Sequence, residues 1–275
     1  MNSVRAAVCG VLLAAVAAGA GERDTSKVYV VVESDSSMPR PKTADGKLLG
    51  GAYGLTPDGA RDELLNALKV ARQVGKSLGG LTGTFATTSR DWQRQADAAG
   101  AAACLRAVVL KRVLTNASLG HYELDVNCRI DVNSGAGWKK AYQGRLHTGG
   151  ADMSIRGLRA SDCDQMADQF RGLLLSALFP QRYVGANSKS KTVTMKVKNT
   201  SQHPIRGLSL RIPAGKMHTV ASGQDDRLGP GEAKEIVFRI GYTPSGGGRM
   251  DPRRSRLDEI EFEERARREP VERRR

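Results

Sequence analysis

The chain has 275 residues and a formal net charge of +14. Hydrophobic residues make up 40% of it, which is enough for a folded core, whereas aromatic residues make up only 5%, which argues against an aromatic-lined groove for sugars or bases. The basic excess is spread out and is not interleaved with stacking side chains, so nucleic-acid binding is not expected.

The first 20 residues have the layout of a secretory signal peptide. Arg5 precedes an uncharged run rich in Ala, Val and Leu, and Ala18-Gly19-Ala20 offers a small-x-small cleavage site. The run is shorter than the roughly 20 apolar residues that a membrane-spanning helix needs. We therefore expect cleavage of residues 1–20 and a periplasmic or secreted mature protein; an uncleaved membrane anchor is the alternative.

An α+β domain is predicted over residues 21–180, with a mixed sheet that carries helices on one face. The expected elements are a strand at 27–34, a helix at 57–78, a short strand at 81–88, a helix at 89–100, a strand at 103–114, a hairpin at 123–148 and a helix at 162–178. Thr56 and Ser89 are the expected caps of the first two helices, and Pro180 ends the third.

The hairpin is predicted from strict alternation of apolar and polar residues. Leu124, Val126, Cys128, Ile130 and Val132 share one side of the first arm, and charged or amide side chains occupy the other. A turn at 133–137 leads to the return arm. An antiparallel sheet with one covered face has this pattern, so the charged side needs no function to explain it.

Residues 181–190 lack periodicity and are predicted to be a linker. Short alternating runs then predict a small all-β immunoglobulin-like sandwich over residues 191–244. The segment 245–275 is glycine-rich and then dense in mixed charge with few apolar residues, which predicts a disordered tail.

No sequence motif of a catalytic, nucleotide or cofactor site is present, and neither a cofactor nor a metal is expected. Two arms joined at 133–137 could bring His147 opposite His121 as a surface metal site, although two solvent-facing histidines are the favoured interpretation. Asp162 and Asp164 are interpreted as helix caps and not as partners of a Cys163 nucleophile. Cys104, Cys128 and Cys163 permit either one disulfide with a free thiol or three thiols.

Two resemblances follow from these segments. DAAGAAACLRAVVLKRV at 97–113 and YELDVNCRIDVNSGAGWKKAYQG at 122–144 resemble the α/β domain of the curli-secretion and penicillin-binding-protein-activator lipoproteins of bacterial envelopes. Gly21 stands where those lipoproteins carry the lipid-bearing cysteine. VKNTSQHPIRGLSL at 197–210 and LGPGEAKEIVFRI at 228–240 are similar to immunoglobulin-like domains of envelope proteins.

The signal peptide and the lack of a catalytic motif predict an exported, non-enzymatic protein. The resemblance implies an accessory or scaffolding role in a bacterial envelope, through contacts with envelope proteins. Loops 35–56 and 149–157 and the edges of the sandwich are the expected contact regions. The alternative is binding of an anionic envelope polymer or lipid by the sandwich, through Lys191, Lys196, Lys198, Arg206 and Arg211. A hydrolase with a site assembled from distant residues is the third hypothesis.

Overall fold

The computed structural model of the chain describes most residues from Asp24 to Glu263. The described ranges are 24–37, 56–69, 77–116, 121–151, 161–214, 217–224, 226–241 and 249–263. The predicted signal peptide 1–20 and most of the loops 35–56 and 149–157 lie outside these ranges. Within them, no helix has the length and apolar character needed to span a membrane.

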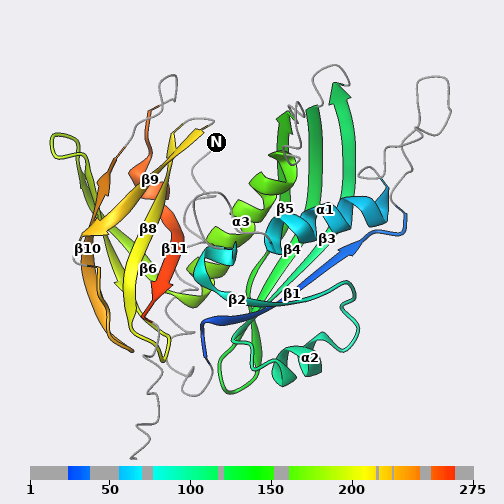
Figure 1. The fold of residues 1–275 in the computed structure, drawn as a ribbon, viewed down its shortest axis with the longest axis horizontal. Coiled ribbons are helices and arrows are strands. Elements are labelled where there is room, and N and C mark those ends of the chain that lie inside the picture. The colour runs from blue at the N-terminus through cyan, green and yellow to red at the C-terminus, as the bar shows by residue number, and fades with distance from the viewer. Residues whose placement is uncertain are drawn as a thin grey trace, which may run out of the picture.

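The first sheet has five strands in the order β2-β1-β3-β4-β5 (Figure 1). They are β1 (Lys27–Ser34), β2 (Thr82–Ala86), β3 (Ala103–Asn116), β4 (His121–Asn133) and β5 (Trp138–Ala151). β1 runs parallel to β2 and β3, whereas β3, β4 and β5 pair antiparallel. The sheet is therefore mixed, as the sequence predicts.

Helices α1 (Pro57–Lys69) and α3 (Ser161–Leu178) cover one face of this sheet. Each presents one apolar stripe, and Leu64 of α1 and Phe170 of α3 are fully buried in the same cluster as Leu105 of β3. Full burial of such a side chain stabilises the fold by roughly 1.5–3 kcal/mol, so these stripes fix where the helices dock.

The third helix, α2 (Trp92–Ala98), lies on the opposite face (Figure 1). Its Ala96 packs with Tyr29, Val31 and Cys104, which are residues of β1 and β3. The prediction of helices on one face only is wrong in this respect. β1 and β3 are apolar on both alternations at this end of the sheet, so both of their faces have to be covered.

The second sheet has six strands, all antiparallel, in the order β11-β8-β9-β10-β7-β6. They are β6 (Gln181–Asn187), β7 (Thr192–Lys198), β8 (Ile205–Ala214), β9 (Met217–Gln224), β10 (Ala233–Ile240) and β11 (Arg256–Phe262). Val193, Leu210 and Phe238 are fully buried on its inner face. The sequence predicts two stacked sheets; hydrogen bonds instead connect all six strands, because β9 pairs with both β8 and β10.

Two segments that the sequence leaves unstructured form strands. The predicted linker 181–190 contains β6, which pairs with β7. The predicted disordered tail 245–275 contains β11, in which Leu257 and Ile260 are fully buried and pair with β8. Composition alone underestimates the tendency of such a segment to fold, because the rest of the sheet supplies the apolar surface and the hydrogen-bonding edge that the segment needs. Residues 264–275 lie outside the described ranges.

A short 3-10 turn, η2 (Ser77–Gly80), replaces the end of the helix predicted over 57–78. Leu78 has a left-handed φ of 52°, which no α-helix accommodates. The turn lies against β11, and a Cβ on Gly80 would lie 1.9 Å from the backbone oxygen of Ile260. Only glycine permits this approach at the φ of 91° that Gly80 adopts.

Most buried apolar side chains of the two sheets belong to one continuous hydrophobic cluster, and a smaller separate cluster lies under α2. α3 contacts β4 and β5 of the first sheet and β11 of the second. At its end, the Thr200 hydroxyl donates to the backbone oxygen of Leu178 at 2.5 Å. Helix α3 and strand β11 therefore join the buried side chains of the two sheets.

Candidate functional site

A cleft of about 700 Å³ opens on the face of the first sheet opposite α1 and α3. Its lining includes Glu33 of β1, Arg106 and Val108 of β3, Asn127 and Arg129 of β4, Lys140, Gln143 and Arg145 of β5, and Ser89. The strand register explains this gathering, because Arg106 lies opposite Arg129 and Arg129 opposite Gln143. The charged side of the predicted hairpin thus forms the floor of a cleft, which the sequence alone does not reveal.

Two of the lining cations share one carboxylate. Asp131 is 1% exposed and accepts hydrogen bonds from Arg106 at 2.7 Å and from Arg129 at 2.8 Å. A buried carboxylate with two guanidinium partners is stable only while both remain charged and in place. This arrangement holds both arginines in fixed positions at the centre of the cleft.

The outer end of the cleft is more exposed. Arg145 donates to Asp125 at 2.7 Å, and the His147 ring contacts the other oxygen of the same carboxylate at 2.8 Å. Burial acts to raise the pKa of Asp125, but the hydrogen bonds from Arg145 and His147 outweigh it and lower the pKa below its ordinary value. Lys140 is exposed and contacts the amide of Gln143 at 3.4 Å. Arg145 and Lys140 are therefore the cations that an incoming anion meets first.

Aromatic side chains pack at the other end of the cleft. The Arg106 guanidinium lies 4.2 Å from the centre of the Trp92 ring. Trp92 in turn packs edge-on against Trp138, with ring centres 5.2 Å apart, and the Trp138 indole donates to Asp97 at 3.0 Å. These contacts hold α2 on the sheet and fix the direction in which Arg106 points.

Ser89 contributes its backbone to the cleft wall. Its N–H donates to the Glu33 carboxylate at 2.6 Å. The sequence predicts that Ser89 caps α2, but the cap position belongs to Asp91, which has a left-handed φ of 55°. The segment before α2 is therefore tied to β1 by the Ser89 N–H, while the Ser89 backbone oxygen accepts from the N–H of Trp92 in α2 at 3.2 Å.

The five predicted polyanion-binding residues are not brought together. Lys196 and Lys198 share the outer face of β7, and Lys191 lies in the turn before that strand. Arg206 of β8 forms an ion pair with Glu261 of β11 at 2.6 Å, toward the opposite edge of the sheet from β7. Arg211 is largely buried and faces α3, so it is not available to a polymer.

His121 and His147, considered from the sequence as a possible surface metal site, are not cross-strand partners. His121 lies opposite Ala151, and His147 lies opposite Asp125. The pairing next to the turn, Asn133 with Trp138, already sets a register in which His121 is several residues out of step with His147, and a bulge after Ile130 adds one more residue to the offset. Across the described ranges, no group of three or more His, Cys, Asp or Glu side chains is arranged to hold a metal ion.

The start of α3 carries a buried charge pair. Arg112 of β3 donates to both oxygens of the fully buried Asp162, at 2.9 and 3.1 Å, and to Glu63 of α1 at 2.5 Å. Arg112 thus connects α1 and α3 to the sheet. Burial raises the pKa of the neighbouring Cys163 thiol, which keeps it protonated. The free, buried thiols of the described chain are Cys104, Cys128 and Cys163.

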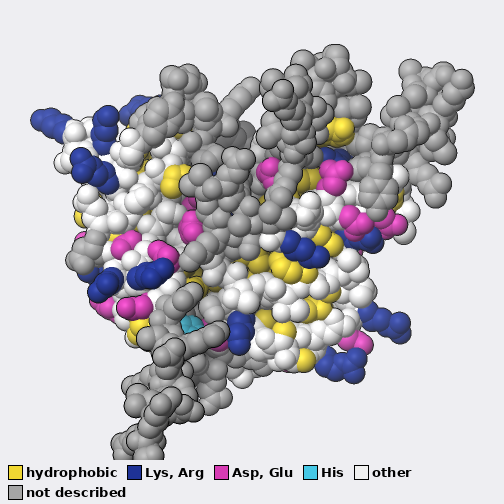
Figure 2. Space-filling view, viewed as in Figure 1, with side chains coloured by type: hydrophobic (Ala, Val, Ile, Leu, Met, Phe, Trp, Pro, Cys, Tyr) yellow, Lys and Arg dark blue, Asp and Glu magenta, His cyan; other side chains and the backbone are white. Residues whose placement is uncertain are grey.

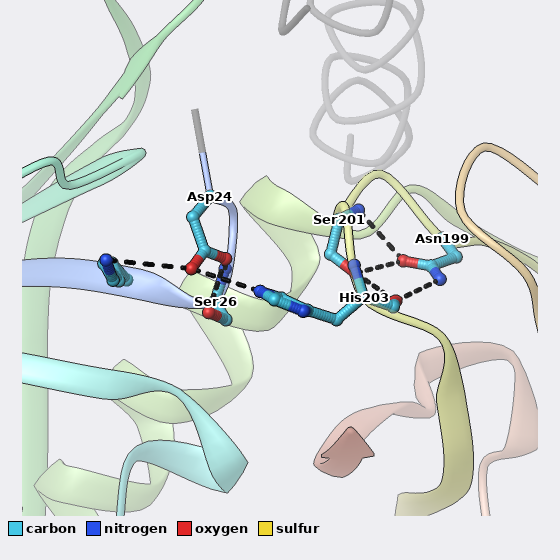
Figure 3. Close-up of polar contacts among 6 residues, drawn as sticks. Asp24, Ser26, Asn199, Ser201 and His203 are labelled. Carbon is cyan, nitrogen blue, oxygen red and sulfur yellow. Dashed lines mark hydrogen bonds and ion pairs between the residues drawn. The ribbon is translucent and has the colours of Figure 1, made fainter. Parts of the chain in front are cut away.

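A second polar cluster joins the N-terminal segment to the turn between β7 and β8 (Figure 3). Asp24 accepts from the Ser26 hydroxyl at 2.5 Å and contacts the His203 ring at 3.3 Å. Asn199 accepts from the Ser201 hydroxyl at 2.7 Å and donates to the backbone oxygen of His203 at 2.9 Å. The Ser26 hydroxyl points to the Asp24 carboxylate and not to the His203 imidazole, so these residues lack the serine–histidine contact of a hydrolase. Their contacts join the N-terminal segment to the turn between β7 and β8.

No protein-family model matches the chain, and no curated protein matches it. Among solved structures, it is similar to a PelC dodecamer from Paraburkholderia phytofirmans, with 18% identity, a TM-score of 0.31, and coverage of 55% of this chain and 87% of that chain. It is also similar to the hypothetical protein CT253 from Chlamydia trachomatis, with 15% identity, a TM-score of 0.28, and coverage of 55% and 93%. Lipoprotein GNA1162 from Neisseria meningitidis shows 14% identity, a TM-score of 0.24, and coverage of 48% and 85%. Likeness at this level assigns neither a family nor a ligand.

Proposed function

We propose that this protein is an exported, non-enzymatic accessory protein of a bacterial envelope, and that it binds an acidic segment of a partner protein in the basic cleft of the first sheet. The observation that supports this proposal is the gathering of four cationic side chains around one cleft, contributed by three adjacent strands. Strands of a packed sheet hold side chains in place better than loops do, so such a surface is suited to recognition.

The chemistry of the cleft favours carboxylates. Arginine guanidinium groups present planar forks that match carboxylate oxygens, and charge-assisted hydrogen bonds are about twice as strong as neutral ones. Arg106 and Arg129 are already partly neutralised by Asp131, so they contribute direction more than net charge. Lys140 and Arg145 project from β5 at the rim. Arg145 is paired with Asp125, so the positive charge that attracts a ligand there comes mainly from Lys140.

The proposal is tested with a fluorescent oligoglutamate peptide as the probe. We expect the double variant Lys140→Gln/Arg145→Gln to raise the Kd at least about tenfold, which corresponds to about 1.4 kcal/mol. Neither substitution touches the buried Asp131, and Asp125 keeps its contact with His147 when Arg145 is replaced, so we expect folding to be retained.

The matched control is Lys139→Gln/Lys189→Gln, which removes two exposed charges outside the cleft. We expect its Kd to stay within about twofold of the parent protein's, since general charge attraction is distributed over the whole surface. Equal weakening in both variants, or no binding of the peptide by the parent protein, would contradict the proposal.

We also propose that the second sheet is an immunoglobulin-like unit. What supports this is strand order, since β6-β7-β10-β9 followed by β8-β11 corresponds to the order A-B-E-D and C-F of that fold. The kinship of the first sheet with the curli-secretion and penicillin-binding-protein-activator lipoproteins, drawn from residues 97–113 and 122–144, is likewise a proposal.

A further inference from the structure

The outer face of the second sheet exposes aliphatic side chains. Among the described residues, the large hydrophobic side chains that are exposed are Val184 at 43%, Val220 at 44% and Val237 at 37%. They lie on β6, β9 and β10. In β9 and β10, the residues on either side of Val220 and Val237 are buried, so the two valines point outward. Exposed apolar side chains that share one face are a mark of an interaction surface.

Basic side chains surround Val184 and Val237. Arg182 of β6 lies opposite Lys196 of β7, which lies opposite Glu235 of β10. Lys198 follows on β7, and Arg239 extends from β10 on the same side. The face therefore carries four cations and one carboxylate over β6, β7 and β10. In the space-filling view, Lys and Arg side chains project from the margin of the molecule where this sheet lies (Figure 2).

This face points away from the rest of the molecule. α3 and η2 pack against β11, and Arg211 on β8 is engaged by Asp168 of α3. β10 lies at the far side of the second sheet (Figure 1). The contacts of α3 and η2 are therefore made with the β8–β11 part of the sheet, and the 3-10 turn η3 (Pro252–Arg254) contacts β6 and β8. Val220 lies opposite Arg211, at the border between the two parts.

We propose that this outer face docks the protein on an anionic lipid surface. Cations near an anionic leaflet are attracted to it, each Lys or Arg strengthening binding roughly fivefold, and aliphatic side chains between them enter the headgroup region. Neighbouring strands are spaced by about 4.8 Å, and β7 with its lysines lies between the strands of Val184 and Val237. These side chains therefore spread over a two-dimensional surface and do not follow a single strand. A bilayer contacts such an area, whereas a single polymer chain follows one groove. This inference does not depend on the function proposed for the cleft.

The test uses co-sedimentation of the purified chain with vesicles of phosphatidylglycerol and phosphatidylcholine in equal parts, and with pure phosphatidylcholine vesicles. We expect binding to the anionic vesicles only, and a loss of most binding at about 0.5 M NaCl, where the screening length falls to roughly 4 Å. Arg182→Gln/Lys196→Gln should weaken the partition at least about tenfold. Val184→Thr/Val237→Thr, which keeps the β-branched shape, should weaken it about threefold or more.

The cleft variant Lys140→Gln/Arg145→Gln is the charge-matched control, and it should bind the vesicles like the parent protein. Equal binding to both kinds of vesicle, or equal loss in the cleft variant, would overturn the inference. A further combination of results would overturn it: the valine variant binds the vesicles like the parent protein, and soluble polyphosphate binds the protein as tightly as the vesicles do. Those two results together would assign the face to a free polyanion.

Discussion

Arg211 of β8 donates to Asp168 of α3 at 2.7 Å, across 43 residues of chain. The same guanidinium donates to Asp258 of β11 at 2.9 Å, and Arg171 donates to Asp168 at 2.9 Å. Burial acts to lower the pKa of Arg211, but the two carboxylates outweigh it and raise the pKa above its ordinary value. Arg211 therefore stays ionised, and this interface cluster of Asp168, Arg171, Arg211 and Asp258 connects α3 to the second sheet.

Removal of one member should leave buried charge without compensation. We expect Arg211→Met to lower the free energy of unfolding by about 3 kcal/mol, as measured by urea denaturation. Arg206→Met is the control, since it removes an ion pair whose two side chains are 48% and 39% exposed and should change stability by less than about 1 kcal/mol. Similar losses in the two variants would show that the interface cluster contributes no more than a surface pair.

Strand β11 should be indispensable although it comes from a segment of disordered composition. Truncation after residue 248 exposes the inner face that Leu257 and Ile260 cover, and we expect the cooperative unfolding transition to be lost or the midpoint to fall sharply. Truncation after Glu263 removes only residues beyond β11 and should leave the transition unchanged. An unaltered urea midpoint in the shorter chain would contradict the assignment of β11 to the core.

Gly80 tests the contact between η2 and β11. Gly80→Ala places a methyl group 1.9 Å from the Ile260 oxygen at a φ of 91°, so we expect a loss of at least about 3 kcal/mol in thermal or urea unfolding. Gly100→Ala is the matched control, because Gly100 also has a positive φ but has nothing within 4 Å of the added carbon. It should lose only about 1–2 kcal/mol, the strain of the left-handed backbone. Equal losses would mean that η2 can move off β11 at little free-energy cost.

The thiol of Cys128 should be inert in the folded protein. Burial raises its pKa to about 12, whereas an unfolded thiol ionises near 8.5, so the native state retains a proton that the unfolded state loses. Stability should therefore fall as the pH rises above about 8.5, by up to about 1.4 kcal/mol per pH unit for each such thiol. At pH 8 a chromophoric disulfide reagent should label Cys104, Cys128 and Cys163 readily in the urea-unfolded chain and at under about 1% of that rate in the native chain, with Cys9→Ser in place so that the fourth cysteine does not contribute. Rapid labelling of the native chain would contradict the burial of the thiols.

Local sequence patterns determined the elements in which apolar and polar side chains separate onto opposite faces of a single strand or helix. The hairpin of β4 and β5 followed from alternation because one face had to be buried, and Leu124 and Val126 are indeed fully buried. α3 followed from an apolar stripe and a proline stop. In these elements the local preference and the tertiary environment favour the same state.

Only the tertiary structure decided what depends on partners distant in the chain. β11 is a strand because β8 offers it a pairing edge, and its own composition carries no sign of this. Arg211 looks like a surface cation in its alternating strand, but α3 covers it and supplies the carboxylate. The cleft exists because β3, β4 and β5 align Arg106, Arg129 and Gln143 in one row, and because α2 covers only one end of that face. Pairing register and the packing of one sheet on another are long-range properties, since each depends on contacts between residues far apart in the sequence, and local periodicity contains neither.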